Sequence, residues 1–130
     1  MALLIGLVKA LVEPQSLSPL SGSLKTWQII QDAMRAVVVK GSAKKAFQNA
    51  PYTLAAKTGT AQVFSLKVNQ QYDPKVIPQN LLDHSLFVLF APFEKPRIVL
   101  AIVLENSQIP AAYLARKILD DYFAVTNDAT

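Results

Sequence analysis

A lysine, two threonines and a glycine interrupt an otherwise apolar, strand-like segment, LAAKTGTAQVF, at residues 54–64. Side chains alternate between the two faces of a strand, so Thr58 and Thr60 share one face and Lys57 lies on the other. Two hydroxyl groups at this spacing can bind a carboxylate that lies along the strand, and the Lys57 ammonium group can stabilise its charge. Gly59 has no side chain, which lets another group approach the backbone closely. The segment is therefore a candidate carboxylate-binding site.

A second pattern, SAKK, begins at Ser42 and has the S-x-x-K spacing of a serine nucleophile and its lysine partner. It follows a glycine suited to a helix end, so we interpret it as a solvated turn and not as a nucleophile. The only histidine, His84, lies near the start of a predicted strand and is interpreted as a hydrogen-bonded structural residue. Asp83 and His84 have no evident third ligand, so the sequence predicts no metal site, and it predicts no cofactor.

The apolar pattern predicts the elements that must position these residues. Steps of three and four residues predict helices over 26–41 and 110–123, and continuous apolar runs predict strands over 52–64, 85–93 and 97–105. The last two strands are joined by a short turn and should pair as an antiparallel hairpin. Their apolar residues occupy both faces, which is typical of central strands covered on each side. The order predicts an α+β fold with one antiparallel sheet flanked by helices.

Four further details follow from the same sequence. Ser23 or Thr26 can cap the first helix, and the stretch at 65–84 is a long irregular connection of the kind that is often functional. Asp120 is assigned to the solvated face of the second helix. The residues predicted to form the buried face of that helix are Ala111, Leu114, Ile118 and either Leu119 or Tyr122.

Length, composition and charge exclude several classes of protein. With 130 residues, 52% of them hydrophobic and 17% charged, the chain is predicted to form one globular domain. The net charge of +4 is mild and the basic residues form no stripe, so nucleic-acid binding is not predicted. The apolar run within residues 1–15 contains Lys9, is too short to cross a bilayer and lacks the features of a signal peptide. It predicts a buried helix or strand.

The setting of the Lys-Thr-Gly triplet resembles a known family. K-T-G is one of the signatures of penicillin-binding proteins and serine β-lactamases. The segment AAKTGTAQVF is similar to the third strand of the transpeptidase domain of class B penicillin-binding proteins, and DHSLFVLFAPF and RIVLAIVLEN are similar to the two strands that follow it. The upstream pattern W..I...M..VV..G, from Trp27 to Gly41, fits the same family, particularly its elongation-type members. The resemblance is continuous from Trp27 to Phe123.

This resemblance implies part of the serine β-lactamase/D,D-peptidase-like transpeptidase fold and a D,D-transpeptidase that cross-links the cell wall. It implies that Lys57 positions the substrate. It also implies that Thr58 and Thr60 hold the terminal carboxylate of a peptidoglycan stem peptide ending in D-Ala-D-Ala, or the carboxylate of a β-lactam. Gly59 would let the substrate lie against the strand, and the backbone N–H of Thr60 would be an oxyanion-hole donor. The whole protein would act at the periplasmic face of the bacterial inner membrane.

The family also requires S-x-x-K and S-x-N motifs upstream of K-T-G. This chain has no S-x-N, and its one S-x-x-K string, at Ser42, lies in a different context. We therefore expect no catalytic residue in this chain. We expect a C-terminal part of a transpeptidase domain that is inactive alone, with residues 1–25 as a poorly matched lead segment, 26–123 as the matched region and 124–130 as a tail.

Two alternatives stay open from the sequence. One is a fragment of a serine β-lactamase-type protein, which also carries K-T-G. The other is a non-catalytic module that binds a peptide or an anion along the strand. In every case the two apolar strands need cover on both faces, so we expect the isolated chain to self-associate through exposed apolar surface.

Overall fold

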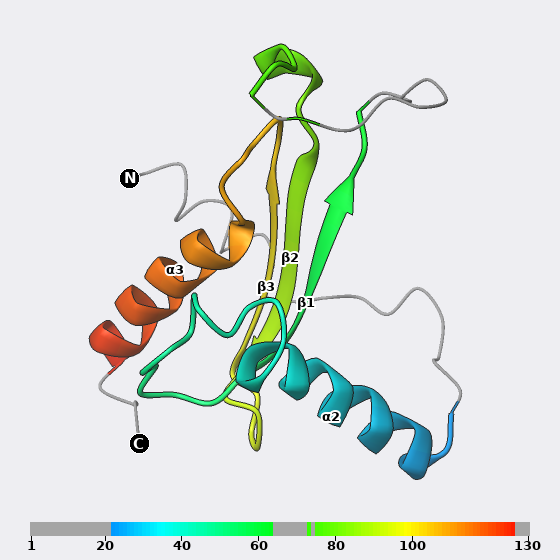
Figure 1. Ribbon diagram of the computed structural model, residues 1–130. Helices are drawn as coiled ribbons and strands as arrows, with labels where there is room; N and C mark the ends of the chain where they lie inside the picture. The colour runs from blue at the N-terminus through cyan, green and yellow to red at the C-terminus, as the bar shows by residue number, and fades with distance from the viewer. Residues whose placement is uncertain (1–21, 64–72, 74, 127–130) are drawn as a thin grey trace.

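The computed structural model describes residues 22–63, 73 and 75–126, and its elements follow the predicted order (Figure 1). The elements are α2 (Leu24–Val39), β1 (Ala55–Ala61), the short 3-10 helix η1 (Gln79–Leu81), β2 (His84–Ala91), β3 (Ile98–Leu104) and α3 (Ala111–Thr126). The predicted α+β architecture is confirmed. Each strand is shorter than predicted, and most of the first half of the predicted irregular stretch lies outside the described residues.

The three strands form one antiparallel sheet in the order β1-β2-β3. The predicted hairpin of β2 and β3 is confirmed. The prediction that both are central strands is wrong for β3, which is an edge strand among the described residues. β3 pairs only with β2, although its sequence is as apolar as that of a covered strand. An apolar run shows that a strand needs cover, but not whether the described chain provides it.

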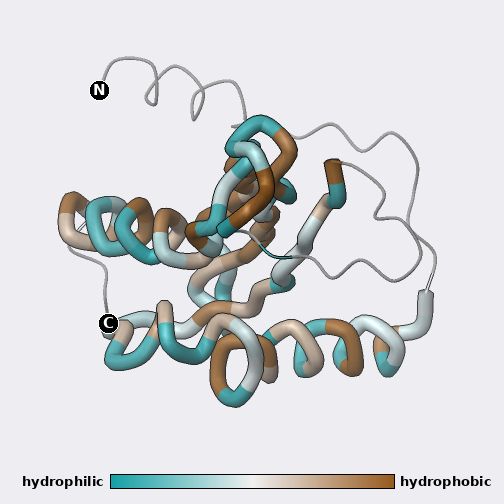
Figure 2. Tube along the Cα trace, turned by 45° about the horizontal axis from the view of Figure 1, so that its top comes forward, coloured by the Kyte–Doolittle hydropathy of each residue, from teal (hydrophilic) through white to brown (hydrophobic). Residues whose placement is uncertain are grey.

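The core lies on one face of the sheet. The buried side chains of β2, such as Phe87 with 1% of its surface exposed, pack against α3 and against the segment that follows α2. The other face is open over much of its area, where Val88, Val99 and Val103 are 44%, 73% and 57% exposed. Both helices alternate apolar and polar residues along their length (Figure 2), as elements with one buried face do. The sheet therefore has a covered face and an open apolar face.

Helix α2 begins at a side-chain cap. The Ser23 hydroxyl accepts the backbone N–H of Thr26 at 3.1 Å, so Ser23 is the capping residue of the two that the sequence allowed. Near its other end, Val37 and Val38 pack against the core. The N-terminal turns of α2 extend beyond the sheet (Figure 1), and no residue of α2 is buried. The predicted apolar stripe therefore contacts the core only where α2 leads toward β1.

Helix α3 buries most of its predicted face, because Ala111 and Leu119 are buried and Ile118 and Tyr122 are half-buried against the core. Leu114, predicted to be buried, is 38% exposed. Four of the buried residues lie four positions apart and form a straight row along α3, and alanines in that row let the helix approach the sheet closely. The buried residues are Ala111, Ala112, Ala115, Leu119 and Phe123. The helix continues to Thr126, three residues into the predicted tail.

A polar cluster joins α2 to the approach to β1 and to the hairpin turn. Thr53 donates a hydrogen bond to the Glu94 carboxylate, and the backbone N–H of Phe93 donates to the Thr53 hydroxyl at 3.0 Å. The Arg35 guanidinium lies 4.6 Å from the Phe93 ring centroid and 3.7 Å from a Glu94 oxygen. The bond from Thr53 is the main cause that lowers the pKa of Glu94. The cluster fixes the point at which the chain enters β1.

A second network ties α3 to the segment between α2 and β1. The Tyr52 hydroxyl donates to Asp120 Oδ1 at 2.7 Å, and Arg116 Nε lies 2.8 Å from both Asp120 oxygens. Asp120, which was assigned to a solvated face, is therefore the centre of a hydrogen-bonded network. Burial raises the pKa of Tyr52 most, the hydrogen bond to Asp120 and its negative charge raise it further, and Arg116 partly opposes them.

We expect Tyr52→Phe to lower the free energy of unfolding at pH 7 by about 1–2 kcal/mol, because it removes a hydrogen bond to a carboxylate. The folded-state pKa of Tyr52 is raised. The stabilisation by the neutral phenol is therefore fully present below the unfolded pKa of about 10 and is lost as the pH rises further. Urea unfolding at several pH values and phenolate absorbance titration measure both effects. In the titration, a late-ionising component should vanish in Tyr52→Phe and persist in the control Tyr113→Phe. A single transition shared by all tyrosines would contradict the assignment.

Candidate carboxylate-binding site

Strand β1 carries all four candidate residues, and its pairing with β2 decides which face each one occupies. Thr58 lies opposite Phe87, a buried residue of the covered face, and Thr60 lies opposite Ser85 on that same face. Lys57 lies opposite Val88, on the open face. The structure thus separates the lysine from the two threonines, as the alternation predicts.

Lys57 reaches back toward the threonines despite its place on the open face. The residue is exposed, and its Nζ donates a hydrogen bond to the backbone carbonyl of Thr58 at 2.6 Å. The long side chain therefore turns along the strand and brings its positive charge to the backbone between the two threonines. The lysine can stabilise an anion there although its Cα–Cβ bond points to the open face.

Gly59 meets a close neighbour, as its place within the strand suggested. A Cβ added at Gly59 would lie 3.2 Å from the Cβ of Leu86, the residue opposite it in β2. This contact is tighter than an ordinary one, so a larger residue at position 59 would require Leu86 to shift. Because Gly59 has no side chain, Leu86 can pack beside it on the open face, and the backbone of β1 stays accessible.

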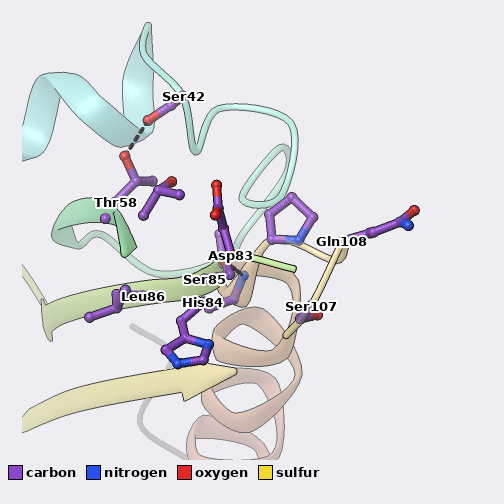
Figure 3. Close-up of a pocket in the computed structure, with 13 residues that line it drawn as sticks. Ser42, Thr58, Asp83, His84, Ser85, Leu86, Ser107 and Gln108 are labelled. Carbon is purple, nitrogen blue, oxygen red and sulfur yellow. Dashed lines mark hydrogen bonds between the residues drawn. The ribbon is translucent and has the colours of Figure 1, made fainter. Parts of the chain in front are cut away.

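The two threonines line a cavity of about 510 Å³ at the end of the covered face. Figure 3 shows the cavity bounded by β1, by the start of β2 and by the loop that leads into α3. The Ser85 hydroxyl at its floor accepts the backbone N–H of Ala111, at the first residue of α3, at 2.9 Å. The cavity combines hydroxyl groups with an apolar wall, which suits a small polar ligand.

Ser42 makes a contact in this site that sequence reasoning missed. Its Oγ lies 2.9 Å from Oγ1 of Thr58, and the two side chains point toward one another in Figure 3. The residue is exposed and lies in a turn, as predicted. Its contact with the threonine was not foreseen, because the S-x-x-K spacing directed attention to a nucleophile and the contact joins residues 16 positions apart.

His84 has the structural role that the sequence predicted. Its Nδ1 accepts the backbone N–H of Asn106 at 3.0 Å and so ties the start of β2 to the end of the hairpin. Asn106 has a positive φ of 49°, a conformation that asparagine adopts more readily than most residues. Its side-chain amide donates to the carbonyls of Asn80 and Leu82. This network closes the end of the sheet beside the cavity.

Two features of other kinds of function are absent from the described part of the chain. Within residues 22–63, 73 and 75–126, no group of three or more histidine, aspartate or glutamate side chains is placed to hold a metal ion. In the same residues, no helix has both the length and the hydropathy needed to cross a membrane. The groups available at β1 are hydroxyls, one ammonium and backbone N–H groups, which together suit a carboxylate.

Comparison with protein families supports the resemblance inferred from the sequence. The family model described as "Penicillin binding protein transpeptidase domain" matches residues 4–123. The peptidoglycan D,D-transpeptidase MrdA of Salmonella typhimurium is 44% identical over 109 residues, which is 80% of this chain and 18% of the relative. The Escherichia coli K12 protein of the same name is 44% identical over 98 residues, covering 72% and 16%. The chain thus spans less than a fifth of the length of these relatives.

Solved structures agree with these sequence relatives. A complex between penicillin-binding protein PBP2 and MreC from Helicobacter pylori superposes with a TM-score of 0.69 and 25% identity, covering 88% of this chain and 21% of the matched chain. Pseudomonas aeruginosa PBP2 in complex with WCK 5153 gives a TM-score of 0.57 and 27% identity, covering 85% and 23%. The three-stranded sheet and its two helices are therefore part of a transpeptidase fold. The chain belongs to the penicillin-binding protein transpeptidase family, and within that family it is similar to PBP2.

Proposed function

We propose that this chain supplies the substrate-binding strand of a peptidoglycan D,D-transpeptidase, as a C-terminal portion of the catalytic domain. One observation carries the proposal. The hydroxyls of Thr58 and Thr60 lie on one face of an edge strand, and the Lys57 ammonium group contacts the backbone between them. This arrangement suits the terminal carboxylate of a stem peptide ending in D-Ala-D-Ala, or the carboxylate of a β-lactam.

The free edge of β1 supports binding of an extended peptide. β1 pairs only with β2 among the described strands, so one edge is open for a peptide to add as a further strand. In an antiparallel strand, the backbone groups of alternate residues point to the same edge. The Thr58 carbonyl is reached by Lys57 Nζ, which supports an outward direction for the backbone groups of Thr58 and Thr60. The N–H of Thr60 would then be placed to donate to an oxyanion.

The reaction requires a serine that this chain does not supply in our proposal. That serine would attack the carbonyl of the D-Ala-D-Ala bond, expel the terminal D-alanine and form an acyl-enzyme, which an amine of a neighbouring stem peptide resolves. The role of β1 is to hold the carboxylate and to orient the carbonyl against its backbone. Ser42 Oγ contacts the hydroxyl of Thr58, which is not a general base at neutral pH, and this supports a role other than nucleophile. The isolated chain would therefore be inactive.

The cellular setting follows from the same assignment. A transpeptidase that cross-links stem peptides acts on the peptidoglycan of the cell wall, so the whole protein would work at the periplasmic face of the inner membrane. The family match favours a penicillin-binding protein over a β-lactamase-type fragment. The other alternative, a non-catalytic module that binds a peptide or anion, shares the site at β1 and predicts binding without covalent chemistry.

Incubation with benzylpenicillin should leave the mass of this chain unchanged, because β1 binds a carboxylate and no activated nucleophile lies beside it in our assignment. Intact-mass spectrometry with peptide mapping gives the measurement, and a full-length PBP2-type transpeptidase that gains the mass of one penicillin is the positive control. A covalent adduct of one penicillin on Ser42 that is absent from Ser42→Ala would contradict the assignment. The chain would then contain its own nucleophile.

The carboxylate site itself is tested by the binding of two peptides that end in D-Ala-D-Ala, one with a free carboxylate and one with a C-terminal amide. We expect Thr58→Val and Thr60→Val each to weaken binding of the carboxylate peptide about ten-fold, because each removes a hydrogen bond to a charged group. Binding of the amide peptide should change little. Amide chemical shifts followed by NMR give the affinities, and Thr126→Val on α3 is the matched control. Equal binding of both peptides to the unmodified chain would reject a carboxylate site at β1.

We also propose that the isolated chain self-associates through the open face of the sheet. Val99 and Val103 lie on this face near the free edge of β3, and both are more than half exposed. Burying such side chains on association is favourable. The double variant Val99→Lys/Val103→Lys should lower the average mass measured by light scattering, whereas Val125→Lys, an exposed valine on α3, should not. A monomeric parent chain would refute this proposal.

A further inference from the structure

We propose that Ser42 is a positioning residue, whose hydroxyl orients that of Thr58 so that Thr58 donates its hydrogen to the ligand carboxylate. This inference rests on the proposed function of β1. Its basis is the 2.9 Å contact between Ser42 Oγ and Thr58 Oγ1, in which either oxygen can be the donor. Binding of a carboxylate ligand determines which of the two hydroxyls donates.

The direction follows from the hydrogen-bonding capacity of a hydroxyl. Threonine has one hydroxyl hydrogen to donate and two lone pairs that accept, whereas an ionised carboxylate only accepts. If Thr58 donated its hydrogen to Ser42, it could not donate to the carboxylate. With a ligand bound, Ser42 must therefore donate to Thr58, and Thr58 to the carboxylate. Such a chain of hydrogen bonds polarises each member and strengthens the last bond.

The backbone on both sides of Ser42 is held in place. The next residue, Ala43, is buried with 1% of its surface exposed, and its N–H donates to the carbonyl of Val37 at 3.1 Å. A Cβ added at Gly41 would lie 2.8 Å from the Cα of Val37, so the turn needs glycine to approach α2 this closely. Ser42 thus projects from a turn with little freedom to move. A hydroxyl on such a support can fix its partner's orientation.

Ser42 belongs to the segment that leads from α2 to β1, residues 40–54. This segment is also bonded to α3. Arg116 Nη1 donates to the carbonyl of Gln48 at 3.0 Å, while its Nε bonds the Asp120 carboxylate. Phe47 is buried against the core and stacks with Phe87 of β2, their ring centroids 5.8 Å apart. The segment that carries Ser42 is therefore fixed to α2, to the sheet and to α3. These contacts hold it over β1 before any ligand arrives.

The test compares Ser42→Ala with Ser42→Thr, which keeps the hydroxyl, and with Ser107→Ala. Ser107 also lines the cavity, but its hydroxyl bonds within its own turn to Ile109. The readout is the ratio of affinities for the free-carboxylate and amide-capped D-Ala-D-Ala peptides, measured by NMR. We expect Ser42→Ala to lower this ratio about three- to ten-fold, the effect of one hydrogen bond, and Ser42→Thr and Ser107→Ala to preserve it.

A double-mutant cycle separates orientation of Thr58 from a general effect on the fold. In a Thr58→Val background, Ser42→Ala should cause no further loss, because the hydroxyl that it orients is already absent. An equal loss in both backgrounds would overturn the inference, as would an unchanged ratio in Ser42→Ala. If the unmodified chain shows no preference for the carboxylate peptide, the proposed function fails and the inference fails with it. If that preference is present but independent of Ser42, only the inference fails.

Discussion

The register in which β1 pairs with β2 is the constraint on which the rest of the site depends. Because side chains alternate, one choice of register places Thr58 and Thr60 on the covered face and Lys57 on the open face. A slip of one residue would exchange these faces, remove Thr58 from Ser42 and bring the lysine against the core. The buried packing of Phe87 opposes such a slip. The hydrophobic core thus fixes the chemistry of the strand as well as its position.

The fold could be predicted from local sequence signals because each element has a strong one. The apolar runs that became β2 and β3 and the capped helix at Ser23 are patterns of neighbouring residues, and the structure confirms them. The incorrect predictions concern which apolar surfaces are covered by other elements. The outer position of β3 and the exposure of Leu114 depend on which surfaces meet in three dimensions. Periodicity shows that a helix has an apolar stripe, but small residues such as Ala115 decide which row of that stripe lies closest to the sheet.

The candidate site was only half visible in the sequence. Lys57 to Thr60 form a contiguous motif whose alternation predicts their faces, and the placement in β1 agrees. Ser42 and Arg116 have no motif that relates them to that strand. Their roles arise from a turn that returns over β1 and from a side chain that reaches across from α3. Contacts between segments 16 and 68 positions apart are set by tertiary packing, which no spacing rule reports.

The hydrogen bond between Arg116 of α3 and the Gln48 carbonyl has a consequence for substitutions in this helix. Under the proposed function, a substitution at Arg116 would alter ligand binding without contacting the ligand, because it would loosen the segment that precedes β1 and carries Ser42. If β1 holds both the stem-peptide carboxylate and the β-lactam carboxylate, as proposed, such a substitution would weaken both interactions through the same hydroxyl. Helix α3 would then change the two affinities together, so drug tolerance gained there would carry a matching cost to the natural reaction.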